Sequence, residues 1–344
     1  RRKFGLTGTP WSNSLDEMHP LVDLVQPGLL GEKKAFREYF AMPIKRGQKR
    51  SAAGEILLRA RQRELELGRV LRRVMIQRDK SVIQDQLKGK QVNIIFCPLT
   101  EVQYTLYERA LALPDVRLCV RGLEPCDCGR EGRQRSSCCY QIPPEDQYGN
   151  IDPRAVLWLK SHETRDGYEA CPFCPRCLSF AVIAKLQKIA NHPALLQVDP
   201  QTQSAAKQAE VRRFAEALGL DALAPVGGAE RPRNFLELCR TDACGKMRAL
   251  AGLLAKSHGE NARLAAAEKH KVLVFSWSTQ MLDIIQAFAK SQGYSHMRLD
   301  GSTPQSVRQS MIDKFNNDPT IFLFLVSTRA GGVGLNLTSA NRVV

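Results

Sequence analysis

Residues 271–327 decide the fold class of this chain, and they read KVLVFSWSTQMLDIIQAFAKSQGYSHMRLDGSTPQSVRQSMIDKFNNDPTIFLFLVS. Apolar runs typical of strands alternate in this segment with amphipathic patterns typical of helices. We expect strands at 271–276, 294–300 and 321–327, and helices at 281–291 and 306–315. Nearly continuous apolar strands joined by helices form parallel sheets that are covered on both faces. The sequence therefore predicts a doubly wound α/β fold for its final third.

The length and composition of the chain limit its class. Its 344 residues predict about two domains. A content of 43% hydrophobic and 25% charged residues excludes disorder, collagen and a coiled coil for the bulk of it. The longest wholly apolar run, residues 321–326, is far shorter than the ~20 residues of a membrane span, so no membrane partner is expected. Since the chain begins with Arg1 and ends within a strand-like run, we expect both ends to be cuts in a longer protein.

Positive charge is concentrated in the first hundred residues. The chain has 50 basic and 35 acidic residues, a net charge of +15, and residues 1–100 hold 20 of the basic and 10 of the acidic ones. Within residues 45–90, which include Arg72 and Arg73, 14 basic side chains alternate with apolar ones at helical spacing. Such a stretch is either a solvated helix face or a strip that faces nucleic-acid phosphates.

Three segments place polar residues where strands of an α/β sheet end. They are LTGTP at 6–10, RLDGSTP at 298–304 and VSTRAGGVGLNLTSAN at 326–341. Each offers hydroxyl groups and backbone N–H groups, which are the donors that phosphate oxygens accept from. Taken singly, each is also compatible with an ordinary turn. No segment of the chain has the phosphate-loop pattern GxxxxGK[ST] or the dinucleotide pattern GxGxxG.

Taken together and in this order, the segments resemble the motifs of the Swi/Snf family of double-stranded-DNA translocases, which are superfamily-two helicase-like ATPases. LTGTPWSN is similar to motif III apart from Trp11, and residues 71–90 are similar to the Arg-rich crossing between the two lobes apart from Ile76 and Gln77. KVLVFSWSTQMLDII, RLDGSTP and VSTRAGGVGLNLTSANRVV are similar to motifs IV, IVa and V. The segment EPCDCGREGRQRSSCCY at 124–140 resembles the Cockayne syndrome group B-like branch of the family.

The resemblance implies two RecA-like lobes of the P-loop NTPase fold, each with a doubly wound parallel sheet. Residues 1–66 would be the C-terminal part of the first, ATP-binding lobe, and 67–90 a basic linker or brace. Residues 91–344 would be an incomplete second lobe, cut before motif VI. Its parts would be a Cys-rich insertion at 119–178, a flexible loop at 199–235 and a conserved core at 269–344.

The resemblance also implies roles for individual residues. Thr7, Gly8 and Thr9 would couple the lobes near DNA. Arg298, Ser327 and Thr328 would lie along the DNA backbone, like the basic pair Arg72 and Arg73. Gly334 and Asn336 would face the nucleotide.

No catalytic residue is assigned to this chain. The family's phosphate-loop Lys, its Asp-Glu pair and its motif VI arginines find no counterpart in the sequence. Because phosphoryl transfer needs these groups, the chain alone is expected not to hydrolyse ATP, whereas the full-length protein is expected to use ATP and Mg²⁺.

Seven cysteines in the insertion form a candidate metal site. Cys171, Cys174 and Cys177 are spaced as two overlapping CxxC pairs, the spacing at which thiolates bind one tetrahedral Zn²⁺. Zinc is the favoured ligand, with an iron–sulfur cluster and reduced thiols without a metal as the alternatives. The seven would serve one site with spares or two sites that share a thiolate, and the remaining four members are Cys126, Cys128, Cys138 and Cys139.

The function that the family resemblance implies is an ATP-dependent translocase acting on duplex DNA in repair or genome maintenance. Its partners would be double-stranded DNA, ATP and possible repair or chromatin proteins, and its location the nucleus. The alternative is a non-catalytic, zinc-stabilised docking module for protein or DNA. An RNA helicase of the same superfamily is disfavoured by the forms LTGTP and GGVGLN.

Overall fold

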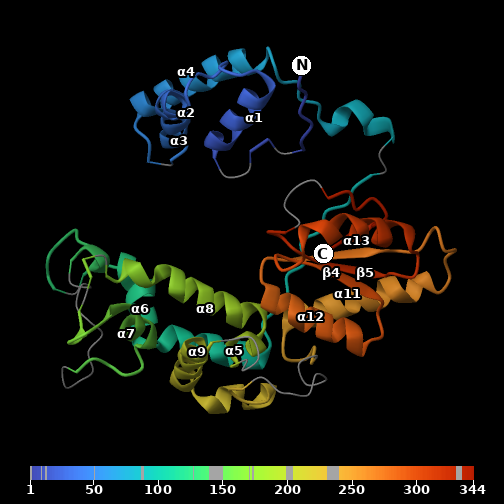
Figure 1. The fold of residues 1–344 in the computed structure, drawn as a ribbon. Coiled ribbons are helices and arrows are strands. Elements are labelled where there is room, and N and C mark those ends of the chain that lie inside the picture. Colours follow the sequence, from blue (N-terminus) through green and yellow to red (C-terminus); the bar gives the residue numbers. More distant parts are fainter. Residues whose placement is uncertain are drawn as a thin grey trace. The chain divides into compact units, whose positions relative to one another are not determined.

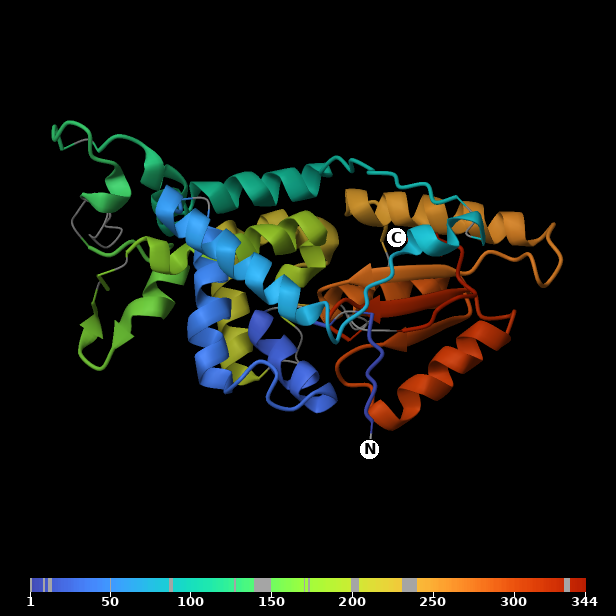
Figure 2. The ribbon, with the colours of Figure 1, turned by 90° about the horizontal axis from the view of Figure 1, so that it is seen from above.

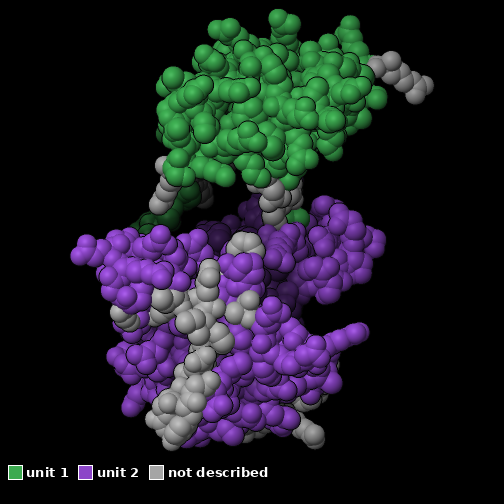
Figure 3. Space-filling view, turned by 90° about the vertical axis from the view of Figure 1, so that its left-hand side faces the viewer, with its two compact units in different colours: residues 1–94, 332–335 green, residues 95–331, 336–344 purple. Residues whose placement is uncertain are grey.

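A computed structural model describes all residues of the chain except 1, 9, 12–13, 50, 87–88, 127, 139–149, 170, 173, 199–203, 231–239 and 331–334. The chain divides into two compact units (Figure 3). Unit 1 comprises residues 1–94 and 332–335, and unit 2 comprises residues 95–331 and 336–344. Among the residues described, unit 1 has one core of buried apolar side chains and unit 2 has two. No helix of the described residues has the length and apolar character needed to cross a membrane.

Unit 1 is built from short helices around a small apolar core. The longest helix among its described residues, α4, buries Ala60, Leu67 and Leu71, whereas arginines such as Arg59 and Arg69 are exposed. The core brings together Met18, Phe36 and Leu67 from three different helices. The elements are η1 (Leu15–Glu17), α1 (Met18–Val25), α2 (Lys33–Phe36), the π-helical turn η2 (Arg37–Ala41), α3 (Met42–Gly47), α4 (Gly54–Leu71) and η3 (Lys80–Gln86).

The first part of unit 2 is a helical bundle. Helix α5 (Glu101–Ala112) begins at a capping box, in which Thr100 and Gln103 each accept a hydrogen bond from the other's backbone N–H. Buried side chains of α5, α7, α8 and α9 share one core. The other elements are α6 (Pro114–Val120), η4 (Arg121–Leu123), η5 (Arg135–Ser137), α7 (Val156–His162), β1 (Glu163–Thr164), β2 (Gly167–Tyr168), η6 (Arg176–Leu178), α8 (Ser179–Asn191), η7 (Pro193–Leu196), α9 (Ala205–Leu218) and η8 (Leu220–Val226).

The second part of unit 2 is a parallel four-stranded sheet in the order β4-β5-β3-β6. Leu323 and Leu325 of β5 belong to the core that α11 and α12 cover, whereas Phe324 packs against Phe315 of α13 on the opposite face. The sheet therefore lies between α13 and the pair α11 and α12 (Figures 1 and 2). The elements are α11 (Gly245–Asn261), β3 (Val272–Ser276), α12 (Thr279–Ser291), β4 (His296–Leu299), α13 (Gln305–Asn317), β5 (Leu323–Ser327) and β6 (Arg342–Val343). The predicted α/β class with a doubly wound parallel sheet is confirmed.

One expected loop contains regular structure. We expected 199–235 to be flexible, but α9 and η8 lie within it, and Val211, Phe214 and Leu218 of α9 are buried. These residues follow the spacing of one helix face, so burial of that face stabilises the helix. The surrounding Pro- and Gly-rich sequence had obscured this pattern.

Candidate functional site

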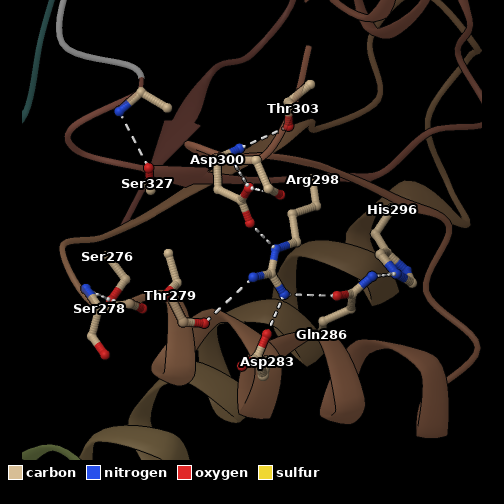
Figure 4. Close-up of polar contacts among 12 residues, drawn as sticks. Ser276, Ser278, Thr279, Asp283, Gln286, His296, Arg298, Asp300, Thr303 and Ser327 are labelled. Carbon is tan, nitrogen blue, oxygen red and sulfur yellow. Dashed lines mark hydrogen bonds and ion pairs between the residues drawn. The ribbon is translucent and has the colours of Figure 1, made fainter. Parts of the chain in front are cut away.

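The strand ends of the sheet carry a polar network centred on Asp300 (Figure 4). Asp300 directly follows β4, and its Oδ1 accepts hydrogen bonds from the backbone N–H of Ser302 at 2.9 Å and from the Ser302 hydroxyl at 2.6 Å. Its own N–H donates to Thr303 Oγ1 at 3.1 Å. Burial alone would raise the pKa of Asp300, but these bonds and the Arg298 guanidinium hold it below its usual value. The carboxylate therefore fixes the turn after β4.

Arg298 on β4 is engaged inside unit 2. Its guanidinium donates to Asp300 at 2.8 Å, to Asp283 of α12 at 2.6 Å and to Gln286 of the same helix at 3.0 Å. Only 20% of its side chain is exposed. Figure 4 shows the guanidinium lying between α12 and the turn after β4. Arg298 was expected to lie along the DNA backbone. In the structure, its charge is already compensated by these two carboxylates.

Ser327 and Thr328 lie at the neighbouring strand end. Ser327 ends β5 and is buried, and its hydroxyl accepts the N–H of Ala330 at 3.2 Å. Thr328 is exposed, and its N–H donates to the carbonyl of Ser276 at the end of β3. Parallel strands present their carboxyl ends at one edge, which brings Ser276, Asp300 and Ser327 together there.

Thr328 also lines a cavity of about 450 Å³ within unit 2. The walls include Trp277 after β3, Lys246 and Met247 of α11, and Asn191 at the end of α8. Lys246 Nζ donates to Asn191 Oδ1 at 2.7 Å. The cavity therefore joins the strand ends to the C-terminal end of α8.

The remaining expected nucleotide and DNA residues fall in several places. Asn336 is exposed, and its carbonyl accepts a hydrogen bond from Asn316 Nδ2 at 2.8 Å. In unit 1, Thr7 and Gly8 are exposed, and Arg72 and Arg73 are exposed just after α4. Two residues of these sets, Thr9 and Gly334, lie outside the described residues, as does Cys139 of the metal set.

The cysteines of the insertion form two separate groups. One joins Cys171, Cys174 and Cys177 to His162, and the other joins Cys126, Cys128 and Cys138. Within each group, one sulfur or imidazole nitrogen per residue lies within 4.8 Å of the others. Both groups have donors that suit zinc, and the imidazole is a candidate donor that sequence reasoning missed. The sequence did hold a signal for this imidazole, the spacing H-x8-C-x2-C-x2-C. In the structure, a short hairpin separates His162 from the cysteines.

Partial burial makes two thiols of the first group less acidic. Burial raises the pKa of the Cys174 and Cys177 thiols, so forming their thiolates costs free energy, which a bound cation would offset.

Helix α7, which carries His162, is held by the buried carboxylate of Asp115. Its Oδ2 accepts the N–H groups of Leu157 at 2.8 Å and Trp158 at 3.2 Å. This cap at the N-terminus of α7 fixes the position of the imidazole at its other end.

Two family models match consecutive parts of the chain. The SNF2-related domain matches residues 1–195, and the helicase conserved C-terminal domain matches residues 245–344. Among curated proteins, the chain is similar to Switch 2 of Arabidopsis thaliana, at 37% identity over 100% of this chain and 38% of that protein. It is also similar to the DNA excision repair protein ERCC-6-like 2 of Mus musculus, at 31% identity over 99% of this chain and 20% of that protein.

The chain thus spans between a fifth and two fifths of the length of these two relatives. Among solved structures, it is similar to the SWI2/SNF2 ATPase core of Sulfolobus solfataricus in complex with double-stranded DNA. The identity is 20%, with 98% of this chain and 50% of that chain covered, and the TM-score is 0.40.

Proposed function

Because this chain belongs to the SNF2-related family, we propose that it is part of an ATP-dependent motor that moves on duplex DNA. The observation that carries the proposal is the succession of the two family matches, with the second covering the parallel sheet. Relatives named as DNA repair proteins, including ERCC-6-like 2 and RAD54B of Mus musculus, support a role in repair and hence a location in the nucleus. Repair or chromatin proteins are the protein partners that such a role would require.

We propose that residues 1–66 complete the first lobe, that 67–90 brace the two lobes and that 91–344 form the second lobe. The division into compact units at 94 and 95 supports a boundary in this region. Gly334 and Asn336 are proposed to face ATP, and Thr7, Gly8 and Thr9 to couple the lobes.

In the complete motor, ATP bound with Mg²⁺ would be hydrolysed, and this chain would contribute only part of the ATP site. Its sequence has no phosphate-loop pattern, and its Asp16-Glu17 pair follows the LTGTP segment, whereas the Mg²⁺-binding pair of the family precedes that segment. We therefore propose that the 344 residues alone do not hydrolyse ATP. Phosphate release by the purified chain with duplex DNA should not exceed that of a mock preparation, and turnover above the mock would refute this.

The nucleotide assignment is tested in the full-length protein. Asn336→Ala is expected to lower DNA-stimulated turnover, whereas Asn317→Ala, which truncates another exposed asparagine at the end of α13, should leave it unchanged. Equal turnover in both variants and the wild type would contradict the role of Asn336.

For DNA, we propose that Arg72 and Arg73 in unit 1 contact phosphates, and that Thr328 in unit 2 does so as well. Phosphate contacts carry no base information, so Arg72→Ala/Arg73→Ala should weaken binding equally for unrelated duplexes. The slope of log affinity against log salt should fall by about one unit per lost contact. Lys256→Ala/Arg263→Ala removes two exposed charges from the α11 region and should leave the slope unchanged. Equal slopes in both double variants would reject the assignment.

We also propose that the Cys-rich insertion binds zinc as a structural element. Its two groups of sulfur and nitrogen donors support this, and so does the small number of apolar residues between 124 and 140. Elemental analysis of protein purified without added metal should find at least one zinc per chain. Folded protein without zinc would refute the proposal.

A further inference from the structure

The geometry points to a closed zinc centre of three thiolates and one imidazole, in which His162 is the fourth ligand beside Cys171, Cys174 and Cys177. This inference rests on the proposed binding of zinc by the insertion, and it names the site. Its support comes from the distances between donor atoms, the orientation of the imidazole and the elements that the site joins.

Four of the six distances between donor atoms lie close to the edges of a zinc tetrahedron, and all six are within 4.8 Å. With Zn–S near 2.3 Å and Zn–N near 2.0 Å, two sulfurs on one tetrahedral ion lie roughly 3.8 Å apart, and a sulfur and a nitrogen roughly 3.5 Å apart. Cys174 Sγ lies 3.7 Å from Cys171 Sγ and 3.6 Å from Cys177 Sγ. His162 Nε2 lies 3.1 Å from Cys174 Sγ and 3.6 Å from Cys177 Sγ. One ion at the centre would reach all four donors with small shifts.

The imidazole of His162 is oriented as a metal ligand. Its Nδ1 lies 2.9 Å from the carbonyl oxygen of Trp158, which can only accept a hydrogen bond, so Nδ1 carries the proton. The lone pair of Nε2 therefore points to the sulfurs. The ring is buried and stacks on Trp158 at 4.6 Å between ring centroids. A second hydrogen bond that fixes the tautomer and a fixed ring plane are features of histidines that bind zinc.

The donor set also distinguishes between metals. Clusters of the [4Fe–4S] type are held by four thiolates, whereas this group supplies three thiolates and a nitrogen. Three sulfurs and one nitrogen are a common set for structural zinc, and such a site leaves no open position for a substrate. The centre is therefore structural.

The centre would join elements that are separate in sequence. His162 ends α7, the hairpin β1–β2 follows it, and Cys177 lies in η6, directly before α8. Cys174 is buried in the same core as Trp158 and Leu178. A metal at this point would tie the end of α7 to the beginning of α8.

The test measures zinc per chain and the visible spectrum of the cobalt-substituted protein. His162→Ala is expected to lose one zinc equivalent relative to wild type, whereas His296→Ala, which truncates a half-buried histidine far from the thiols in the sequence, should lose none. His162→Cys is expected to keep the zinc, and its cobalt band should shift to longer wavelength because a fourth thiolate replaces the nitrogen.

Each result decides the assignment. A full zinc count in His162→Ala, or a cobalt spectrum of His162→Cys identical to wild type, would overturn the role of His162 while leaving zinc binding by the insertion intact. Wild-type protein without zinc would overturn both proposals, and so would iron with acid-labile sulfide. If His162→Ala fails to fold, the cobalt spectrum of His162→Cys still decides.

Discussion

Arg298→Met should weaken the sheet edge and leave the electrostatics of DNA binding unchanged. Methionine keeps the length of the side chain but removes every hydrogen bond to Asp283, Gln286 and Asp300. Asp300, whose side chain is 8% exposed, would lose its counter-charge, which costs about 3 kcal/mol for a buried pair. Asp283 is 42% exposed and can be hydrated, so the loss of its ion pair with Arg298 adds less than ~1 kcal/mol. Amides of β4 exchange their hydrogens when the strand opens locally. Lowering the free energy of that opening by about 3 kcal/mol makes the exchange roughly a hundredfold faster.

The pH dependence of this effect has a definite sign. The folded pKa of Asp300 is lowered, so its stabilisation is present above the unfolded pKa and is lost as the pH falls through the folded value. The difference between Arg298→Met and wild type should therefore shrink on acidification. Asp283→Asn, which removes only the more exposed partner, serves as the control and should change exchange little. Unchanged exchange in Arg298→Met, combined with a salt slope of DNA binding lowered by about one unit, would show that Arg298 faces phosphate instead.

Two further substitutions test packing and charge in unit 2. Gly245→Ala should destabilise unit 2 by about 2 to 3 kcal/mol in urea unfolding, because its Cβ would lie 1.9 Å from the carbonyl oxygen of Pro98. Gly252→Ala, with open space at the Cβ in the same helix, should instead stabilise it by up to ~1 kcal/mol, and equal effects would refute the clash. Glu210→Gln should cost roughly 3 kcal/mol near neutral pH. Burial alone would raise the pKa of Glu210. Hydrogen bonds from Lys160 and Lys207 and the ion pair with Lys185 instead lower it to about 2. The difference in melting temperature should close between pH 4.5 and 2 as wild-type Glu210 is protonated, and a constant difference would contradict this charge assignment.

The sheet could be predicted from the sequence because its signal is local. The strands expected at 271–276, 294–300 and 321–327 correspond to β3, β4 and β5, which differ only by shorter ends. Every residue of β5 is buried, and this is why its sequence is a continuous apolar run. Turn residues after each strand then located the polar edge of the sheet.

The partners at the candidate sites were missed, because they lie outside the motifs that carried the sequence argument. Asp283 reaches Arg298 from α12, fifteen residues earlier, and nothing in RLDGSTP indicates that contact. His162 precedes Cys171 by nine residues, and although that spacing was visible, the fold of α7 and its hairpin is what shows that the imidazole reaches the thiols. For α9 the signal was local: its apolar residues have helical spacing and its composition favours a helix, but the surrounding Pro- and Gly-rich sequence led us to expect a loop.

Helix α8 connects the Cys/His centre to the strand-end cavity. It begins two residues after Cys177 and, at 13 residues, extends for roughly 20 Å. At its other end, Gln103 donates to the carbonyls of Ile189 and Ala190, and the Cys244 thiol donates to that of Asn191, which lines the cavity with Thr328.

The insertion also shares its core with the rest of unit 2. Trp158 and Leu178 from the insertion pack in one cluster with Leu106 of α5, Ile189 of α8 and Phe214 of α9. Removing the insertion would expose these side chains to water, at a cost of about 25 cal/mol for each Å² of apolar surface uncovered. A separable docking module would instead have a core of its own. Residues 119–178 are therefore an integral part of unit 2, and a change at the proposed metal centre should first affect the end of α8 that holds Asn191.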